Sequence, residues 1–153
     1  MEKKISISIA CDHAGSDVRE AIKKMLEELG YSVIDHGCYG TDSVNYPDYA
    51  HLVCKDIQDE NAALGILICG TGIGMSMAAN KHRGIRAAVC TDEFCTEMTR
   101  RHNNANVLCM GARVITLEKA LGLAKLFVET EFDGGRHQLR IDMVNALDYT
   151  EKA

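Results

Sequence analysis

Hydrophobic residues follow two different periods at the N-terminal end of this chain. Residues 4–10, KISISIA, place Ile5, Ile7 and Ile9 on one face of an extended segment, and a period of two predicts a β-strand. Residues 16–30 instead repeat apolar positions every three or four residues and finish at Gly30, the pattern of an amphipathic helix with a glycine C-cap. The chain therefore opens with a strand followed by a helix.

This alternation continues along the rest of the sequence. Short apolar runs predict four further strands, at residues 31–35, 64–69, 85–90 and 106–111. Helical spacing, and a proline that can open a helix, predict helices between these runs and after the last one. One predicted helix begins at Pro47 and carries Ala50, Val53, Cys54 and Ile57, and another contains Phe94, Cys95 and Met98. A long helix is predicted over residues 116–131. A last helix begins near Arg136, with Ile141, Val144 and Leu147 facing inward.

Strands that alternate with helices pair in parallel through right-handed crossovers. The sequence thus predicts an α/β fold: a Rossmann-like, doubly wound sheet of five parallel strands in the order 2-1-3-4-5, with helices on both faces. At 153 residues, the chain is expected to form a single domain over residues 1–153. The extra C-terminal helix has no strand after it, so we expect it to pack on a partner subunit.

Composition and charge narrow the classes of partner. A net charge of −5 argues against nucleic acid or an anionic membrane as the main partner, because both require a basic surface. No apolar stretch is long enough to cross a membrane or to act as a signal peptide. Seven cysteines without a C-x-x-C pair predict free, mostly buried thiols in a reducing compartment, the cytoplasm, and neither disulfides nor a structural zinc site.

Candidate chemistry gathers where the first and third strands end. Asp12 and His13 follow the first strand, and Cys69 ends the third, directly before the glycine-rich segment 70–74, GTGIG. Ligands of open parallel sheets bind outside such carboxyl ends, where the strand order reverses. Glycines let backbone N–H groups approach an oxyanion, and the dipole of a following helix is expected to favour the thiolate of Cys69.

The same residues allow other interpretations. Asp12 could cap the first helix, and His13 alone could be a surface histidine. The glycine-rich segment lacks the third glycine of a dinucleotide loop, since Met75 stands there, and no GK[ST] follows it. Asp92, about twenty residues further on, is near where a ribose-binding acid belongs, which keeps a dinucleotide site among the alternatives.

A polar cluster follows the fourth predicted helix. Residues 100–107, RRHNNANV, carry His102 and Asn103 towards the fifth strand. The plain interpretation is a polar helix end, because cations suit the C-terminal end of a helix dipole.

A second basic cluster opens the last helix. In residues 133–140, DGGRHQLR, Arg136 and Arg140 stand one helical turn apart. Cations at a helix N-terminus are unfavourable unless an anion lies among them, so these arginines, with Arg113, predict a phosphate clamp. A base, an oxyanion hole and a phosphate handle together suit proton abstraction next to the carbonyl of a small phosphorylated sugar.

In seven ordered stretches the sequence resembles the type B family of ribose-5-phosphate isomerases. The stretches are CDHAG, VNYPDYA, LICGTGIGMSMAANK, GIRAAVC, RRHNNANVL, GAR and GGRHQLR, and the resemblance extends over nearly the whole length of the chain. The resemblance implies an enzyme that interconverts ribose 5-phosphate and ribulose 5-phosphate through an enediolate. It also implies that the enzyme needs no metal or cofactor, and that it forms a homodimer or tetramer whose pocket is completed by a second subunit.

The resemblance implies roles for individual residues as well. Cys69 would be the base that moves a proton between two sugar carbons, in the cysteine branch of the family, because Met75 stands where another branch has glutamate. His102 would help to open the furanose ring. The enediolate would be stabilised by Thr71 and the amides of Gly70, Gly72, Ile73 and Gly74. The other implied contacts are Asp12 and Asn103 for hydroxyl groups, His13, Arg113, Arg136 and Arg140 for the phosphate, and Tyr46 along the sugar.

One further function stays open on these residues, and two others are disfavoured. Isomerases of allose 6-phosphate and galactose 6-phosphate share most of the motifs, so a six-carbon substrate is an alternative. A phospho-acceptor receiver needs an acid pair after the first strand and an aspartate after the third, whereas this chain has Asp12 alone and Cys69. A flavodoxin-like nucleotide module needs a hydroxyl-rich phosphate loop where CDHAG stands.

Overall fold

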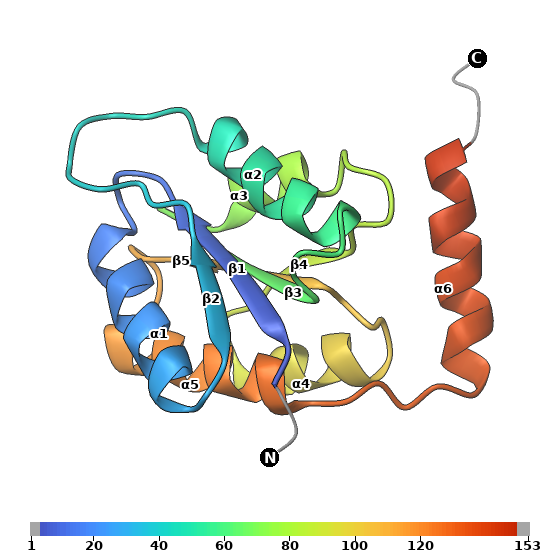
Figure 1. The fold of residues 1–153 in the computed structure, drawn as a ribbon. Helices are drawn as coiled ribbons and strands as arrows, with labels where there is room; N and C mark the ends of the chain where they lie inside the picture. Colours follow the sequence, from blue (N-terminus) through green and yellow to red (C-terminus); the bar gives the residue numbers. More distant parts are fainter. Residues whose placement is uncertain (1–3, 150–153) are drawn as a thin grey trace.

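The computed structural model of the protein describes residues 4–149, which form a parallel β-sheet with helices on both faces (Figure 1). The α/β class and the doubly wound arrangement predicted from the sequence are confirmed. The strands are β1 (Ser6–Cys11), β2 (Ser32–Asp35), β3 (Leu64–Cys69), β4 (Ala87–Val89) and β5 (Val107–Gly111).

The helices form two layers and one outlier. In Figure 1, α2 (Tyr46–Gln58) and α3 (Ile73–Ala79) lie above the sheet, and α1 (Ser16–Glu28), α4 (Glu93–Arg101) and α5 (Leu117–Glu129) lie below it. The last helix, α6 (Arg136–Ala146), stands to one side and is followed by a single 3-10 turn, Leu147–Tyr149. The predicted helices thus appear at their expected places, with ends shifted by a residue or two.

The predicted strand order is wrong at one edge. The order is β2-β1-β3-β5-β4, so β5 and not β4 pairs with β3, from Gly65–Val107 to Cys69–Gly111. All residues of β5 are buried, whereas β4 has only three residues, none of them buried. A strand that is apolar on both faces is stabilised in the centre of a parallel sheet, and a short, half-exposed strand suits the edge. The switch point between β1 and β3 is unaffected.

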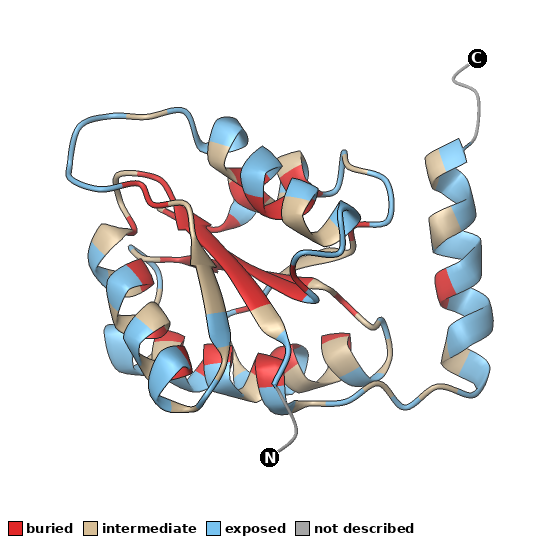
Figure 2. Cartoon of the chain, in the orientation of Figure 1, coloured by how far each residue is buried: buried red, intermediate tan, exposed pale blue. Residues whose placement is uncertain are grey.

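Residues of β3 contribute alternately to two hydrophobic layers, as the pleat requires. Ile66 and Ile68 belong to the core under α1 and α5, whereas Leu67 and Cys69 belong to the core under α2 and α3. Figure 2 shows the buried strands running between the two helical layers. The thiol of Cys69 therefore lies on the α2–α3 side of the sheet.

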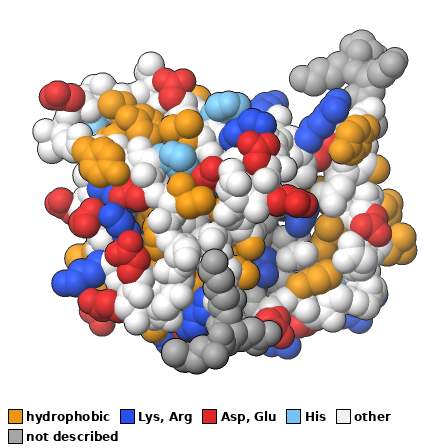
Figure 3. All heavy atoms as spheres, viewed as in Figure 1, with side chains coloured by type: hydrophobic (Ala, Val, Ile, Leu, Met, Phe, Trp, Pro, Cys, Tyr) orange, Lys and Arg blue, Asp and Glu red, His pale blue; other side chains and the backbone are white. Residues whose placement is uncertain are grey.

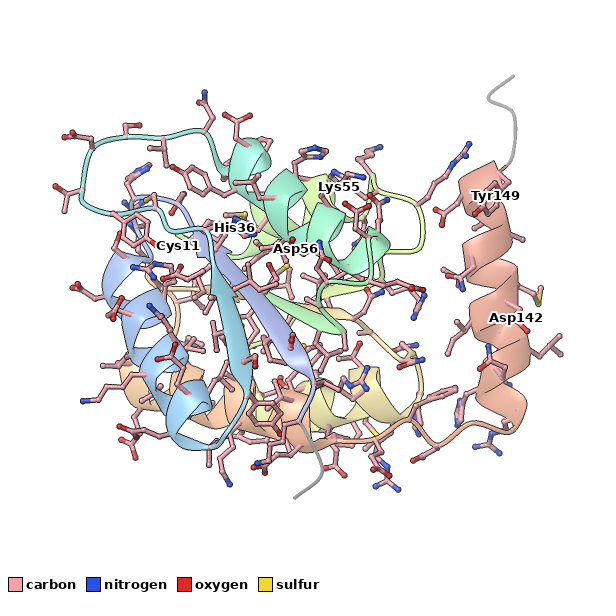
Figure 4. The ribbon with its side chains drawn as sticks, viewed as in Figure 1. Cys11, His36, Lys55, Asp56, Asp142 and Tyr149 are labelled. Carbon is pink, nitrogen blue, oxygen red and sulfur yellow. The ribbon has the colours of Figure 1, made fainter. Side chains whose placement is uncertain are left out.

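A buried polar contact holds α2 against the sheet. Asp56 of α2 accepts a hydrogen bond from the Ser8 hydroxyl of β1 at 2.7 Å, and the same carboxylate oxygen lies 2.6 Å from Nε2 of His36, just past β2. Ser8 is completely buried, and Figure 4 shows His36 and Asp56 where β2 ends beneath α2. A satisfied polar group of this kind fixes the position of the helix that begins at Tyr46.

Helix α6 differs from the expectation of an inward apolar face. Only Ile141 is buried, whereas Val144 and Leu147 are exposed, together with Leu139 and Met143. Hydrophobic side chains are visible along this helix in Figure 3. Within one chain, α6 has too few neighbours to cover both of its sides.

The cysteines are mostly buried, as expected, with two differences in detail. Cys95 is exposed, although the helical pattern placed it on an apolar face, and Cys38 is buried, although it lies in a loop. All seven are free thiols. Among the helices of residues 4–149, none combines the length and the hydropathy that a membrane crossing requires.

Candidate active site

Cys69 ends β3 beneath a tight glycine turn. Its side chain is buried, and its Sγ accepts a hydrogen bond from the backbone N–H of Gly72 at 3.1 Å. Gly72 has φ +82° and caps the N-terminus of α3; a Cβ at this position would lie 2.9 Å from the carbonyl carbon of Met110. Only glycine meets both conditions, so this residue directs an N–H group at the sulfur.

Residues from two other parts of the chain lie against this turn. Gly70 lies against Arg113, since a Cβ on Gly70 would be 3.3 Å from Nη1 of that arginine. Gly74 lies against the ring of Tyr46, at the start of α2, with a corresponding distance of 2.7 Å. The hydroxyl of Thr71 accepts a hydrogen bond from the N–H of Ile73 at 3.2 Å. Arg113, Tyr46 and the 70–74 turn thus form one surface above Cys69.

Asp12 lies beside Cys69 at the next strand end. Its N–H donates to the carbonyl of Ile68 at 3.0 Å, and its carboxylate accepts the N–H of Ala14 at 2.9 Å. Helix α1 begins at Ser16 with Gly15 as its cap, so the interpretation of Asp12 as a helix cap is wrong. The carboxylate instead closes a turn at the switch point.

His13 follows at the same edge. Its Nδ1 accepts the N–H of Val44 at 3.3 Å, which connects it to the loop that leads to Tyr46. The first group of predicted residues is therefore assembled as expected. It comprises Asp12, His13, Tyr46, Cys69, Gly70, Thr71, Gly72, Ile73, Gly74 and Arg113.

The remaining predicted residues form a second group next to α6. His102 is the C-terminal cap of α4, and its ring stacks on that of His137, with centroids 4.2 Å apart and planes at 10°. Nε2 of His102 also lies 4.0 Å from the carboxylate of Asp133. A cleft of about 630 Å³ opens here between α6 and the start of β4. Its lining includes Arg86, Ala87, His102, Asn103, His137 and Arg140.

Arg136 and Arg140 stand one turn apart at the start of α6, as the sequence predicts. Both are exposed on α6, whereas Arg113 lies against Gly70 after β5. The three arginines of the expected phosphate clamp are thus divided between the two groups in a single chain.

The two groups lie at opposite ends of the parallel strands: one at the carboxyl edge, where the strands end, and one at the amino edge, where they begin. Helix α4 follows β4 and runs back, so that its C-terminal cap His102 reaches the amino edge, where Asn106 accepts the N–H of Gly65 at the start of β3. Cys69 ends β3 at the carboxyl edge, beside Gly111 at the end of β5. Five residues of β5 separate the edges, a span of about 15 Å. One chain therefore does not bring His102 to Cys69.

Two contacts of the second group had little signal in the sequence. Asp133 touches His102 and Arg101, and His137 stacks on His102. An acid two glycines before an arginine–histidine pair is a weak hint of such a cluster, but it does not indicate which helix end the acid meets. Burial lowers the pKa of His137, and the nearby charges of His102, Arg136 and Arg140 lower it further.

His102, Asp133 and His137 also offer three ligand atoms within 4.8 Å of one another. Arg101 Nε, however, contacts both carboxylate oxygens of Asp133, at 3.1 and 3.3 Å. The imidazole lone pairs lie in the ring planes, and these planes are nearly parallel. This arrangement is that of a carboxylate paired with neighbouring cations, and not that of ligands directed at one metal ion.

Asp92 has a structural role that argues against a dinucleotide site. Its carboxylate caps α4 by accepting the N–H of Cys95 at 2.8 Å. The acid is therefore already used at a helix start, and the ribose contact that the spacing allowed is not supported.

Comparison with known proteins agrees with this geometry. Residues 7–144 match the model of a family described as ribose/galactose isomerase. The chain belongs to the ribose/galactose isomerase family. Ribose-5-phosphate isomerase B of Escherichia coli is 40% identical over 142 residues, which cover 93% of this chain and 95% of the relative. The match includes both groups of candidate residues, so the chain is an isomerase of this family.

Solved structures of the family have the same fold. Ribose-5-phosphate isomerase B of Clostridium thermocellum superposes with a TM-score of 0.92 at 42% identity, covering 94% of this chain and 97% of that one. The enzyme of Mycoplasma genitalium, with bound ribulose 5-phosphate, has a TM-score of 0.91 at 38% identity and covers 96% of this chain and 98% of that one. The family fold thus extends over almost all of the chain.

Proposed function

We propose that this chain interconverts ribose 5-phosphate and ribulose 5-phosphate, with Cys69 as the base that moves the proton. The observation that carries the proposal is the setting of Cys69: a thiol under the 70–74 turn, bonded to the N–H of Gly72, at the switch point of the sheet. The solved relative that holds ribulose 5-phosphate supports the choice of a pentose phosphate.

The chemistry follows from this setting. The Cys69 thiolate takes the proton from C2 of the open-chain aldose, and the electron pair shifts to the carbonyl oxygen to form an enediolate. Backbone N–H groups of the 70–74 turn, with Thr71, stabilise the negative charge at the N-terminus of α3. The proton on O2 then moves to O1, the C2 carbonyl forms as the Cys69 thiol returns its proton to C1, and the product is the ketose. None of these steps requires a metal ion.

The phosphate and the ring oxygen would be served by the second group of residues, supplied by a partner subunit. This assignment is supported by the separation of His102 from Cys69 and by the uncovered apolar side chains of α6. Joining the groups in a homodimer brings Arg136 and Arg140 towards Arg113 and His13, which together form a binding site for a dianion. Asp12, Asn103 and Tyr46 would contact the sugar. The free thiols suit a reducing compartment such as the cytoplasm.

A substrate panel tests the proposal. The purified protein is assayed with ribose 5-phosphate, ribulose 5-phosphate, allose 6-phosphate and galactose 6-phosphate, with a metal chelator present throughout. We expect the pentose phosphates to have the highest kcat/KM. A higher kcat/KM for either hexose phosphate would assign the chain to a six-carbon substrate, and loss of activity in the chelator would contradict the metal-free step.

A further inference from the structure

Asp133 contacts the end of α4 through both its backbone and its carboxylate. Its backbone N–H donates to the carbonyl of Arg101 at 3.0 Å, and its two carboxylate oxygens lie 3.1 and 3.3 Å from Nε of the same arginine. A side chain fixed by its own backbone and by a guanidinium has little freedom to turn away. These contacts place its carboxylate next to the residue after Arg101, which is His102.

The ring of His102 is bounded on two sides. Nε2 lies 4.0 Å from Oδ2 of Asp133, and the ring face stacks on His137. Desolvation and the charges of His102, Arg136 and Arg140 lower the pKa of His137, which disfavours a second positive charge in the stacked pair. Asp133, beside the cleft, is the acid that the structure places next to the His102 ring.

Two other charged groups that line the cleft are occupied by contacts elsewhere. The guanidinium of Arg86 donates to the carbonyls of Asn103 and Asn104 and to the side chain of Asn145. The carboxylate of Asp148 accepts the N–H of Gly84 at 2.8 Å. Arg140 lines the cleft and is a cation, so it opposes a positive charge on His102.

We propose that Asp133 is a positioning residue for His102 in the opening of the furanose ring, an inference that rests on the proposed function. In this step the imidazole takes the proton of the anomeric hydroxyl, and the O–H electron pair becomes the C1 carbonyl bond. The bond from C1 to the ring oxygen breaks, its electron pair stays on that oxygen, and the imidazolium returns the proton to it. Asp133 orients the ring and stabilises the imidazolium while it exists.

The test separates ring opening from proton transfer between carbons. Ribulose 5-phosphate is acyclic, because its phosphate blocks the hydroxyl that would close a ring on C2. Exchange of its C1 hydrogen with solvent deuterium therefore needs the Cys69 step but not ring opening. Turnover of ribose 5-phosphate needs both. Asp133→Asn is compared with Glu131→Gln, which removes an exposed carboxylate from the same connecting segment and leaves the His102 contacts in place.

We expect Asp133→Asn to lower kcat for ribose 5-phosphate by about tenfold or more, as loss of assisted acid–base catalysis does. Deuterium exchange into ribulose 5-phosphate should stay at the wild-type rate, which also shows that the variant is folded. Glu131→Gln should match the wild type in both assays. Normal turnover of Asp133→Asn, or an equal loss in both assays, would overturn the inference. A wild-type protein inactive in both assays would instead refute the proposed function.

Discussion

At the scale of single residues, cysteines of one chain have very different surroundings. Burial raises the pKa of Cys11 and of Cys54 to about 12, and it also raises the pKa of Cys90 and Cys109. For Cys11, burial is the main cause and the neighbouring Cys38 is the next. These thiols remain protonated at physiological pH, and none of these four lies under the glycine turn.

We predict that Cys69→Ala lowers isomerisation by a factor of about a hundred or more while the fold survives, because a positioned base is lost. The measurement is turnover of ribose 5-phosphate, together with deuterium exchange into ribulose 5-phosphate and circular dichroism. Cys95→Ala is the matched control, since that thiol is exposed. Near-normal exchange in Cys69→Ala would rule out Cys69 as the base.

Gly72 allows a second prediction at this scale. Gly72→Ala meets both a left-handed backbone and the Met110 main chain at 2.9 Å, whereas Gly84→Ala has a similar φ of +75° in open space. Gly84→Ala should lose about 1–2 kcal/mol of unfolding free energy from backbone strain alone. Gly72→Ala should lose about 1–3 kcal/mol more from overpacking. Urea unfolding at one protein concentration measures both, and equal losses would show that the Met110 backbone moves aside.

At the scale of elements, the position of α6 determines which of its residues can act. The helix buries only Ile141 within the chain and begins with two exposed arginines one turn apart. A helix N-terminus attracts anions through its free N–H groups, and adjacent arginines add bidentate donors. The start of α6 is therefore suited to a phosphate group, and its apolar side chains to a second subunit.

We predict that Arg136→Ala and Arg140→Ala each raise KM for ribose 5-phosphate with a smaller effect on kcat. A phosphate contact is present in both the ground state and the transition state, so its loss acts mainly on binding. Lys125→Ala is the control, because this exposed cation pairs with Glu129 on α5. Steady-state kinetics test the prediction, and an unchanged KM in both arginine variants would exclude the clamp.

At the scale of the whole molecule, the arrangement of the sheet separates the two groups of candidate residues. Cys69 lies at the carboxyl edge and His102 at the amino edge, because α4 runs antiparallel to the strands. A helix this far from the switch point cannot deliver its C-terminal cap to the same place. Two chains related by a two-fold axis can, since each then supplies one group to the other.

Subunit mixing tests this arrangement. We predict that inactive Cys69→Ala and His102→Ala variants regain about a quarter of wild-type activity when mixed in equal amounts, because half of random dimers are hybrids and each hybrid has one intact site. Mass spectrometry of the mixture checks that subunits have exchanged. Exchange without recovery of activity would place each site within a single chain.

Local patterns were sufficient to predict a large part of this protein. The alternation of periods from β1 to α6 depends on neighbouring residues, and so do the glycine turn after Cys69 and the arginine pair at the start of α6. These features predict the α/β class, the switch point and the chemistry of the first group, because the carboxyl ends of parallel strands share one edge.

The tertiary structure decided what depends on distant parts of the chain. Strand β5 displaced β4 from the centre because it is apolar on both faces, a comparison between segments that no local period contains. The burial of Cys38, the exposure of Val144 and the contact of Asp133 with His102 likewise depend on which elements pack together. Residue spacing predicts on which face of a helix or strand a side chain lies, but only the packing of the elements determines which residues contact that face.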